Sequence, residues 1–285
     1  VMPPFDREMA SILHRELQQK GVRLRLNEKV VRFDKTGSGC IIHTESGAEL
    51  EADMVIMSVG IRPETTLAKK AGLEIERGIK VNEQMRTSNP SIFAIGDAVE
   101  DLDPVTGTYR LAKQARVAVN TIFGREDSYE GTLLTAIVKI FSLTAAITGP
   151  NERTLKKEKV PYEKVYTHPA SHAGYYPGAS YMSLKILFEP EKGTLLGAQA
   201  IGAAGIDKRI DVLATAVKHG LTVKDLGKLE LAYAPPYGSA KDAVNLAGTT
   251  AQNHIEGLSP LIHWDTLSGK EFLLDVRTPD EFSLG

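Results

Sequence analysis

Cysteine is nearly absent from this chain of 285 residues, because Cys40 is the only one. A single cysteine excludes an internal disulfide framework and any CxxC pair for redox or zinc chemistry. Cys40 follows Gly37-Ser38-Gly39 and precedes Ile41-Ile42, which indicates a turn that enters a strand. We therefore do not expect Cys40 to be a redox centre.

An excess of one charge and long apolar runs are also missing. The 34 basic and 36 acidic residues give a formal net charge of −2, which argues against a nucleic-acid-binding face. No apolar run approaches the roughly 20 residues of a membrane span, so no membrane association is expected. The start of the chain, VMPPFDREMA, indicates a turn and a helix and not a signal peptide. A cytoplasmic location fits these observations.

Patterns typical of metal sites and hydrolases are not found. His168 and His172 lie four residues apart, but Pro169 between them disfavours a helical ligand pair. No second cluster of ligands lies nearby, so we expect no metal site. A Ser-His-Asp constellation with a nucleophile elbow is lacking as well.

The glycine motifs of nucleotide-binding domains are missing too. Nowhere does GxGxxG follow a strand and open a helix. The glycines between Gly197 and Gly205 lack the Lys-Ser/Thr of a phosphate-binding loop, and they indicate a strand followed by a turn.

The most informative stretch that is present is TSNPSIFAIGDA, residues 87–98. A polar turn leads into the apolar run Ile92–Ile95, which ends at Gly96-Asp97. A buried strand that ends in this way delivers a carboxylate to the edge of the sheet where α/β folds bind ligands. Glycine allows a ligand to approach the backbone, and the acid can accept hydrogen bonds from ligand hydroxyls. The alternative is a buried strand followed by a capping aspartate.

The residues before this motif predict half of a nucleotide-binding domain. Asp6 can cap a helix that Gly21 ends. The near-continuous apolar run Met54–Val59 is typical of a strand buried on both faces, and it stops at Gly60. Further strands are expected at Val22–Leu26, Cys40–Thr44 and Ala48–Glu51.

A short helix at Thr66–Glu76 and a strand at Gly78–Asn82 are expected to lead into the motif. After it, a helix rich in small residues begins at Leu111-Ala112-Lys113. Unpaired amides give the start of a helix a partial positive charge, which suits a phosphate or an electron-rich ring. The alternative is a helix that only packs closely on a sheet.

From about Tyr129 the pattern changes to α+β. Strands are expected around Ile137–Ile147, Tyr162–Thr167, Tyr181–Phe188 and Leu195–Ala200. Helices are expected at Ile206–His219, Thr222–Leu229 and Ser239–Asn253.

The motif at residues 87–98 closely resembles the second flavin-binding motif of the pyridine nucleotide–disulfide oxidoreductases, and the resemblance extends over nearly the whole chain. It implies that Asp97, with Gly96 and Ala98, holds the ribitol of FAD. It also implies that the helix start Leu111-Ala112-Lys113 lies against the flavin and that Gly60 lies near the nicotinamide nucleotide of NAD(P)H.

The resemblance implies an α/β fold in four parts. These are the C-terminal half of an NAD(P)-binding domain at 1–65, a returning segment of an FAD-binding domain at 66–128, an α+β dimerisation domain at 129–254 and the truncated start of a rhodanese domain at 255–285. The last part rests on LIHWDTLSGKEFLLDVRTPDEF, with a short helix near Trp264–Leu267 and a buried strand at Phe272–Val276. It contains no sulfur-carrying cysteine, so we assign it no activity.

The resemblance also implies that the chain is the C-terminal part of a longer enzyme. The first flavin GxGxxG, the NAD GxGxxG and the redox-cysteine region of the family have no counterpart in the sequence. We therefore expect no NADH-dependent turnover from the 285 residues alone.

Two tyrosine-rich segments, HAGYYPGAS with Tyr175 and LAYAPPYGSAKD with Tyr233, complete the candidate site. A phenol can donate a hydrogen bond or a proton to sulfur, although residue chemistry alone favours packing at a subunit interface. Within the family, these segments resemble those of coenzyme A disulfide and persulfide reductases. There, two tyrosines of the partner subunit lie beside the active-site cysteine, and Tyr175 and Tyr233 match them.

The resemblance thus implies a homodimeric FAD enzyme. In it, NAD(P)H would drive reduction of a small-molecule thiol disulfide or persulfide of the coenzyme A type. The alternatives are an NADH oxidase or peroxidase of the same fold and a non-catalytic dimerisation fragment.

Overall fold

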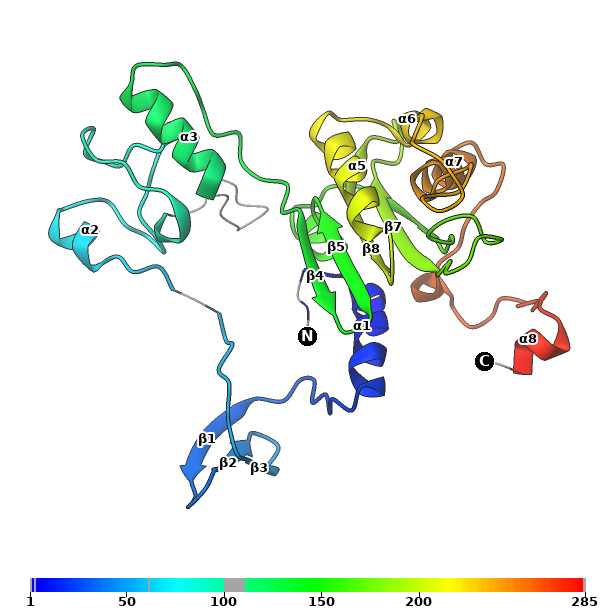
Figure 1. Cartoon of the computed structure of the whole chain (residues 1–285), viewed down its shortest axis with the longest axis horizontal. Coiled ribbons are helices and arrows are strands. Elements are labelled where there is room, and N and C mark those ends of the chain that lie inside the picture. The colour runs from blue at the N-terminus through cyan, green and yellow to red at the C-terminus, as the bar shows by residue number, and fades with distance from the viewer. Residues whose placement is uncertain (1, 3, 61, 100–110, 284–285) are drawn as a thin grey trace.

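The computed structural model describes residues 2, 4–60, 62–99 and 111–283, and for Leu111 and Ala112 it describes only the backbone. Its largest unit is an antiparallel five-stranded sheet in the order β4-β5-β8-β7-β6 (Figure 1). The strands are Ala136–Ile140 (β4), Leu143–Thr148 (β5), Glu163–Thr167 (β6), Met182–Phe188 (β7) and Leu195–Gly202 (β8). The strands predicted in this region are confirmed.

Helices cover both faces of this sheet, as Figure 1 shows. On one face lie α5 (Ile206–Lys218), α6 (Val223–Lys228) and α7 (Ala243–Ile255), which matches the predicted helices. On the other face lies α1 (Arg7–Gln19). Side chains alternate along a strand, so Ala146 packs in the core of α5–α7 while Ala145 and Ile147 pack beneath α1.

Helix α1 ends before the predicted glycine, but the aspartate at its N-terminus does not cap the helix as predicted. Gly21 follows its last turn with a φ of 85°, a conformation that favours glycine. Asp6 occupies the N-cap position, yet its carboxylate makes no hydrogen bond to the helix backbone. The carboxylate bonds Lys185 on β7 and Gln199 on β8 instead. Asp6 therefore joins the helix to the sheet.

A separate three-stranded antiparallel sheet contains β1 (Val30–Lys35), β2 (Cys40–Thr44) and β3 (Glu49–Ala52), at the lower end of the view in Figure 1. Strands β2 and β3 are the two predicted around the turn at Ser46-Gly47, and Cys40 begins β2 as expected. Strand β1 was not predicted. The prediction of a strand at Val22–Leu26 is wrong, since the segment joins neither sheet.

Two predictions of buried strands are wrong. Met54–Val59 lies outside any strand, and Ile56 is 82% exposed. Phe272–Val276 is similar, with Val276 86% exposed. A buried strand needs a neighbouring strand to bond its backbone. Neither segment has one among the residues that the structure describes.

The part between the two sheets contains little regular structure. Helix α2 (Thr66–Lys70) is shorter than predicted, and it ends before Gly72, whose φ is 72°. The strands predicted at Gly78–Asn82 and Ile92–Ile95 are only isolated bridges. Elsewhere in the described chain, the remaining elements are η1 (Gly96–Ala98), α3 (Leu111–Ile122), α4 (Glu152–Lys157), η2 (Trp264–Thr266) and α8 (Pro279–Ser283).

Within the described ranges, no helix has the length and apolar character needed to cross a membrane.

Candidate functional site

The Gly96-Asp97-Ala98 segment forms a single 3₁₀ turn, η1, held at both ends. Gly96 has a φ of 76° and donates its N–H to Oε1 of Gln114 in the first turns of α3, at 2.8 Å. The carbonyl of Ala98 accepts a hydrogen bond from Ile79 N at 2.8 Å. Gln114 therefore fixes the turn against the beginning of α3, while the side chain of Asp97 remains exposed.

The two halves of the predicted flavin site are thus neighbours. Residues 96–98 contact α3, whose backbone begins at Leu111 and continues through Ala112 and Lys113. An exposed carboxylate lies close to a helix whose first amides carry partial positive charge. This arrangement can bind a ligand that presents hydroxyls and electron-rich groups together, which fits FAD. The individual contacts of these residues with FAD stay predictions.

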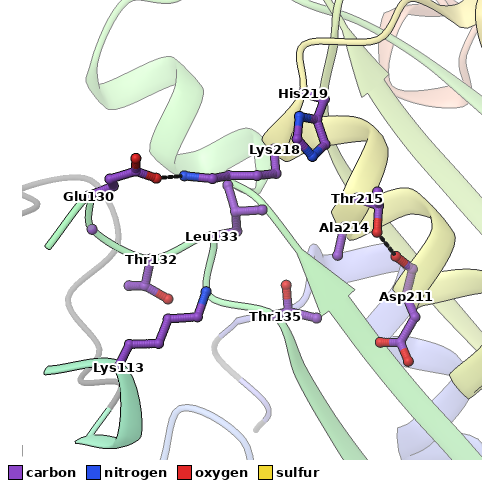
Figure 2. Close-up of a pocket in the computed structure, with 11 residues that line it drawn as sticks. Lys113, Glu130, Thr132, Leu133, Thr135, Asp211, Ala214, Thr215, Lys218 and His219 are labelled. Carbon is purple, nitrogen blue, oxygen red and sulfur yellow. Dashed lines mark hydrogen bonds and ion pairs between the residues drawn. The ribbon is translucent and has the colours of Figure 1, made fainter. Parts of the chain in front are cut away.

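Lys113 lies in a pocket on the side of α3 that faces the five-stranded sheet (Figure 2). The pocket has a volume of about 440 Å³, between α3, residues 130–135 and α5. An ion pair between Glu130 and Lys218 closes one side, and its hydrogen bond lowers the pKa of Glu130. The side chain of Lys113 points into this pocket (Figure 2), and its predicted contact with FAD stays a prediction.

Gly60 directly follows Met54–Val59, is exposed and has a φ of 96°. A side chain at this position would be strained, although open space surrounds it. Its predicted place near the nicotinamide nucleotide stays a prediction.

The structure brings Tyr175 and Tyr233 together across 58 residues of sequence. Their hydroxyl oxygens are 3.3 Å apart. Tyr175 is 77% exposed and Tyr233 48% exposed, so the pair lies open at the surface of the part that contains the five-stranded sheet. The hydrogen bond between the hydroxyls raises the pKa of Tyr233. The hydrogen bond therefore acts against loss of the Tyr233 proton.

A buried ionic cluster between α1 and the sheet was missed by the sequence reasoning. Lys185 on β7 is fully buried, and its Nζ bonds the carboxylates of Asp6, Glu8 and Glu152. Burial alone would lower the pKa of Lys185, but Coulombic attraction and hydrogen bonds to these acids raise it. The only sequence signal was a lysine in the middle of the apolar strand MSLKILF.

The partners of Glu8 and Glu152 in this cluster lower the pKa of both carboxyls. Burial alone would raise the pKa of Glu152, but hydrogen bonds from Lys185 and Tyr162 lower it to about 2. Lys164 also bonds Glu152 and reaches Asp265 at 3.1 Å. Oxygens of Asp6, Glu8 and Glu152 lie within 4.8 Å of one another, and the Lys185 ammonium is the cation that they surround. The cluster therefore joins three distant segments of the chain.

Comparison with known proteins finds two family models and several relatives that match this chain. Residues 1–121 match the family model of pyridine nucleotide-disulphide oxidoreductase, and residues 135–244 match that of its dimerisation domain. A coenzyme A disulfide reductase of Staphylococcus haemolyticus is 33% identical over 268 residues, which are 87% of this chain and 58% of that protein. An NADH oxidase of Methanocaldococcus jannaschii is 33% identical, over 88% of this chain and 58% of that protein.

Two solved structures share the fold closely. Reduced Bacillus anthracis CoADR-RHD aligns with a TM-score of 0.93 and 43% identity, over 100% of this chain and 53% of that one. An NAD-dependent persulfide reductase from A. fulgidus aligns with a TM-score of 0.90 and 38% identity, over 99% of this chain and 54% of that one. The chain thus spans a little over half the length of the relatives that it matches. The predicted α/β fold is confirmed.

Proposed function

Because this chain belongs to the pyridine nucleotide-disulphide oxidoreductase family, we propose that it acts in NAD(P)H-driven, FAD-linked reduction of a small-molecule thiol disulfide or persulfide of the coenzyme A type. The relatives named as coenzyme A disulfide reductase and persulfide reductase support this substrate class.

The observation that carries the proposal is the hydroxyl pair of Tyr175 and Tyr233. When an S–S bond is cleaved, one sulfur leaves as a thiolate and needs a proton or a hydrogen bond. Two exposed phenols 3.3 Å apart can share this task, because one donates to the sulfur while the other stabilises the oxygen of the first. A phenol with the ordinary pKa of about 10 already carries its proton at neutral pH, and the hydrogen bond with Tyr175 raises the pKa of Tyr233 further.

FAD would be held by the Gly96-Asp97-Ala98 turn and by the start of α3. The turn offers a free carboxylate for ligand hydroxyls, and Gln114 fixes its distance from the helix. When bound, FAD supplies the transfer of electrons from NAD(P)H towards sulfur. We further propose a homodimer, with the NAD(P) part at 1–65, the FAD part at 66–128, the dimerisation domain at 129–254 and a rhodanese start at 255–285.

An NADH oxidase is the second candidate, because a relative with that name is equally similar. Reduction of oxygen has no leaving sulfur for the tyrosine pair to stabilise. The effect of the pair on each substrate therefore separates the two functions.

The test compares Tyr233→Phe with Tyr176→Phe in the flavin-loaded enzyme that carries this sequence. Tyr176 is the matched control, because it contacts the ring of His172 and takes no part in the hydroxyl pair. In rapid mixing with coenzyme A disulfide, we expect Tyr233→Phe to slow disulfide reduction by about tenfold, which corresponds to about 1.4 kcal/mol of lost hydrogen bonding. Flavin reduction by NADH should not change. Equal losses in both half-reactions, or in both variants, would contradict the proposed role.

A further inference from the structure

The proximity of Tyr175 and Tyr233 requires a structural explanation. Tyr175 is largely exposed and Tyr233 about half exposed, so burial in a hydrophobic core does not fix the distance between them. They lie on two irregular segments, residues 168–181 and 229–242, which belong to no common strand or helix. Hydrogen bonds that join the two segments therefore set the distance between the hydroxyls, and a side chain that bonds both segments supplies several of them.

Arg209 on α5 is the side chain that reaches both segments. It is 2% exposed, and its Nη2 donates to the carbonyl of Ser171 at 2.9 Å. The same guanidinium bonds Asp242 at 2.7 and 3.2 Å and the carbonyl of Gly205 at 3.1 Å. Ser171 also accepts a hydrogen bond from Ser180, so the loop that carries Tyr175 is closed on itself and moves with Ser171.

The segment of Tyr233 is held at two points. Asp242 caps α7 through Val244 N while it binds Arg209. The residue before Arg209, Lys208, donates from Nζ to the carbonyl of Ala232 at 3.0 Å, next to Tyr233 in the chain. The two segments also bond each other directly, from Ala173 N to the carbonyl of Gly238 at 2.9 Å.

The chemistry of this contact requires an arginine. A planar guanidinium presents five donors in a fixed arrangement, and here its donors meet two carbonyls and a bidentate carboxylate. A lysine ammonium cannot reach these acceptors at once. Buried ion pairs contribute little net stability because both charges lose their water, so geometric specificity is the better account of this one.

We propose that Arg209, assisted by Lys208, is a positioning residue that holds the Tyr175 and Tyr233 hydroxyls together. Its importance for catalysis rests on the proposed function. The position of the two phenols is independent of the proposed function. The following experiment measures only that position.

The experiment is NMR titration of the whole chain labelled with ¹³Cζ-tyrosine, with the signals assigned through Tyr175→Phe and Tyr233→Phe. In the unchanged chain, the titration midpoint of Tyr233 should exceed its value in Tyr175→Phe, because the partner hydroxyl is then missing. Arg209→Lys keeps a positive charge beside Asp242, and we expect it to lower the midpoint of Tyr233 to the value in Tyr175→Phe. Arg277→Met is the control, because Arg277 forms an exposed pair with Asp275. It should leave the midpoint unchanged.

The proposal would be overturned if the Arg209→Lys chain, shown by circular dichroism to be natively folded, kept the same high Tyr233 midpoint as the unchanged chain. If that variant does not fold, Lys208→Met takes its place, since Lys208 is one-third exposed and can be replaced without burying a charge. An unchanged Tyr233 midpoint in Lys208→Met would then overturn it, and a lowered midpoint would support it. Failure of the kinetic test of Tyr233→Phe together with a positive titration would reject the proposed function and keep the positioning role.

Discussion

At the scale of single residues, buried charges join segments that lie far apart in the sequence. Lys185 binds Asp6 across 179 residues, and Arg209 binds Asp242 across 33. Breaking such a pair from one side leaves an uncompensated buried charge, which is strongly destabilising. These residues therefore determine which segments can pack together.

The ionisation of Glu152 makes stability depend on pH. Its pKa in the folded chain is lowered from 4.5 to about 2, and the pKa of Glu8 is lowered as well. Below about pH 4.5 the unfolded chain binds protons that the folded chain does not. Stability should therefore be fully present above that pH and be lost as the pH falls towards about 2.

Thermal unfolding between pH 7 and pH 3 measures this effect. Glu152→Gln removes the carboxylate that titrates, so the midpoint temperature should depend less steeply on pH, and it should be lower at pH 7. Glu191→Gln, at an exposed carboxylate, is the control and should keep the slope of the unchanged chain. The same slope in Glu152→Gln and in the unchanged chain would show that other acids control acid unfolding.

Asp97 gives a second prediction at the residue scale. The purified chain, incubated with FAD and passed through gel filtration, should retain the visible flavin absorption band. Asp97→Asn should retain less flavin, because a carboxylate accepts stronger hydrogen bonds from ligand hydroxyls than an amide does. Asp53→Asn, also at an exposed site, should behave like the unchanged chain. A colourless unchanged chain would mean that these residues do not suffice to hold FAD.

At the scale of elements, close packing of α6 and α7 supports the surface that carries the tyrosine pair. A Cβ added at Gly248 of α7 would lie 2.6 Å from Gly227 N and from the carbonyl oxygen of Val223. The two helices can approach this closely only because the position has no side chain. The N-cap residue of helix α7 is Asp242, the partner of Arg209.

Gly248→Ala should therefore destabilise the chain by about 1–3 kcal/mol, through forced separation of the helices. Gly227→Ala is the matched control in the facing helix. A Cβ at Gly227 would meet Thr249 Oγ1 only at 3.4 Å, an ordinary contact, and alanine favours the helix. Urea unfolding of both variants measures the difference. A Gly248→Ala chain as stable as Gly227→Ala would contradict this account.

At the scale of the whole molecule, the five-stranded sheet and its helices form the dense unit, and the other parts extend from it (Figure 1). The apolar runs Met54–Val59 and Phe272–Val276 are exposed. Tyr175 and Tyr233 are also exposed, on the unit that matches a dimerisation domain. Exposed aromatic residues on such a unit are typical of subunit contacts.

We therefore predict a dimer in solution. Size-exclusion chromatography with light scattering should give twice the 31.0 kDa mass of one chain. The mass should not fall on moderate dilution, since interfaces of homodimers are large and apolar. A mass of one chain across the concentration range would contradict the prediction.

Local patterns in the sequence determined the elements of the dimerisation region, because alternation along strands and the composition of helices are local properties. The glycine at the end of α1 and the Gly96-Asp97 turn were likewise predictable from neighbouring residues. The family resemblance named the tyrosines. It did not supply the 3.3 Å between their hydroxyls, nor the arginine that joins their segments.

Tertiary structure alone decided the pairing of distant charges and the fate of the apolar runs. Lys185 and Asp6 come into contact only when α1 packs on the sheet. The residues next to either of them in the sequence therefore do not predict the contact. Met54–Val59 and Phe272–Val276 have the composition of buried strands. A strand, however, obtains its hydrogen bonds from another segment, and composition cannot state whether that segment is beside it. Local chemistry thus determined the elements, and long-range packing decided their partners.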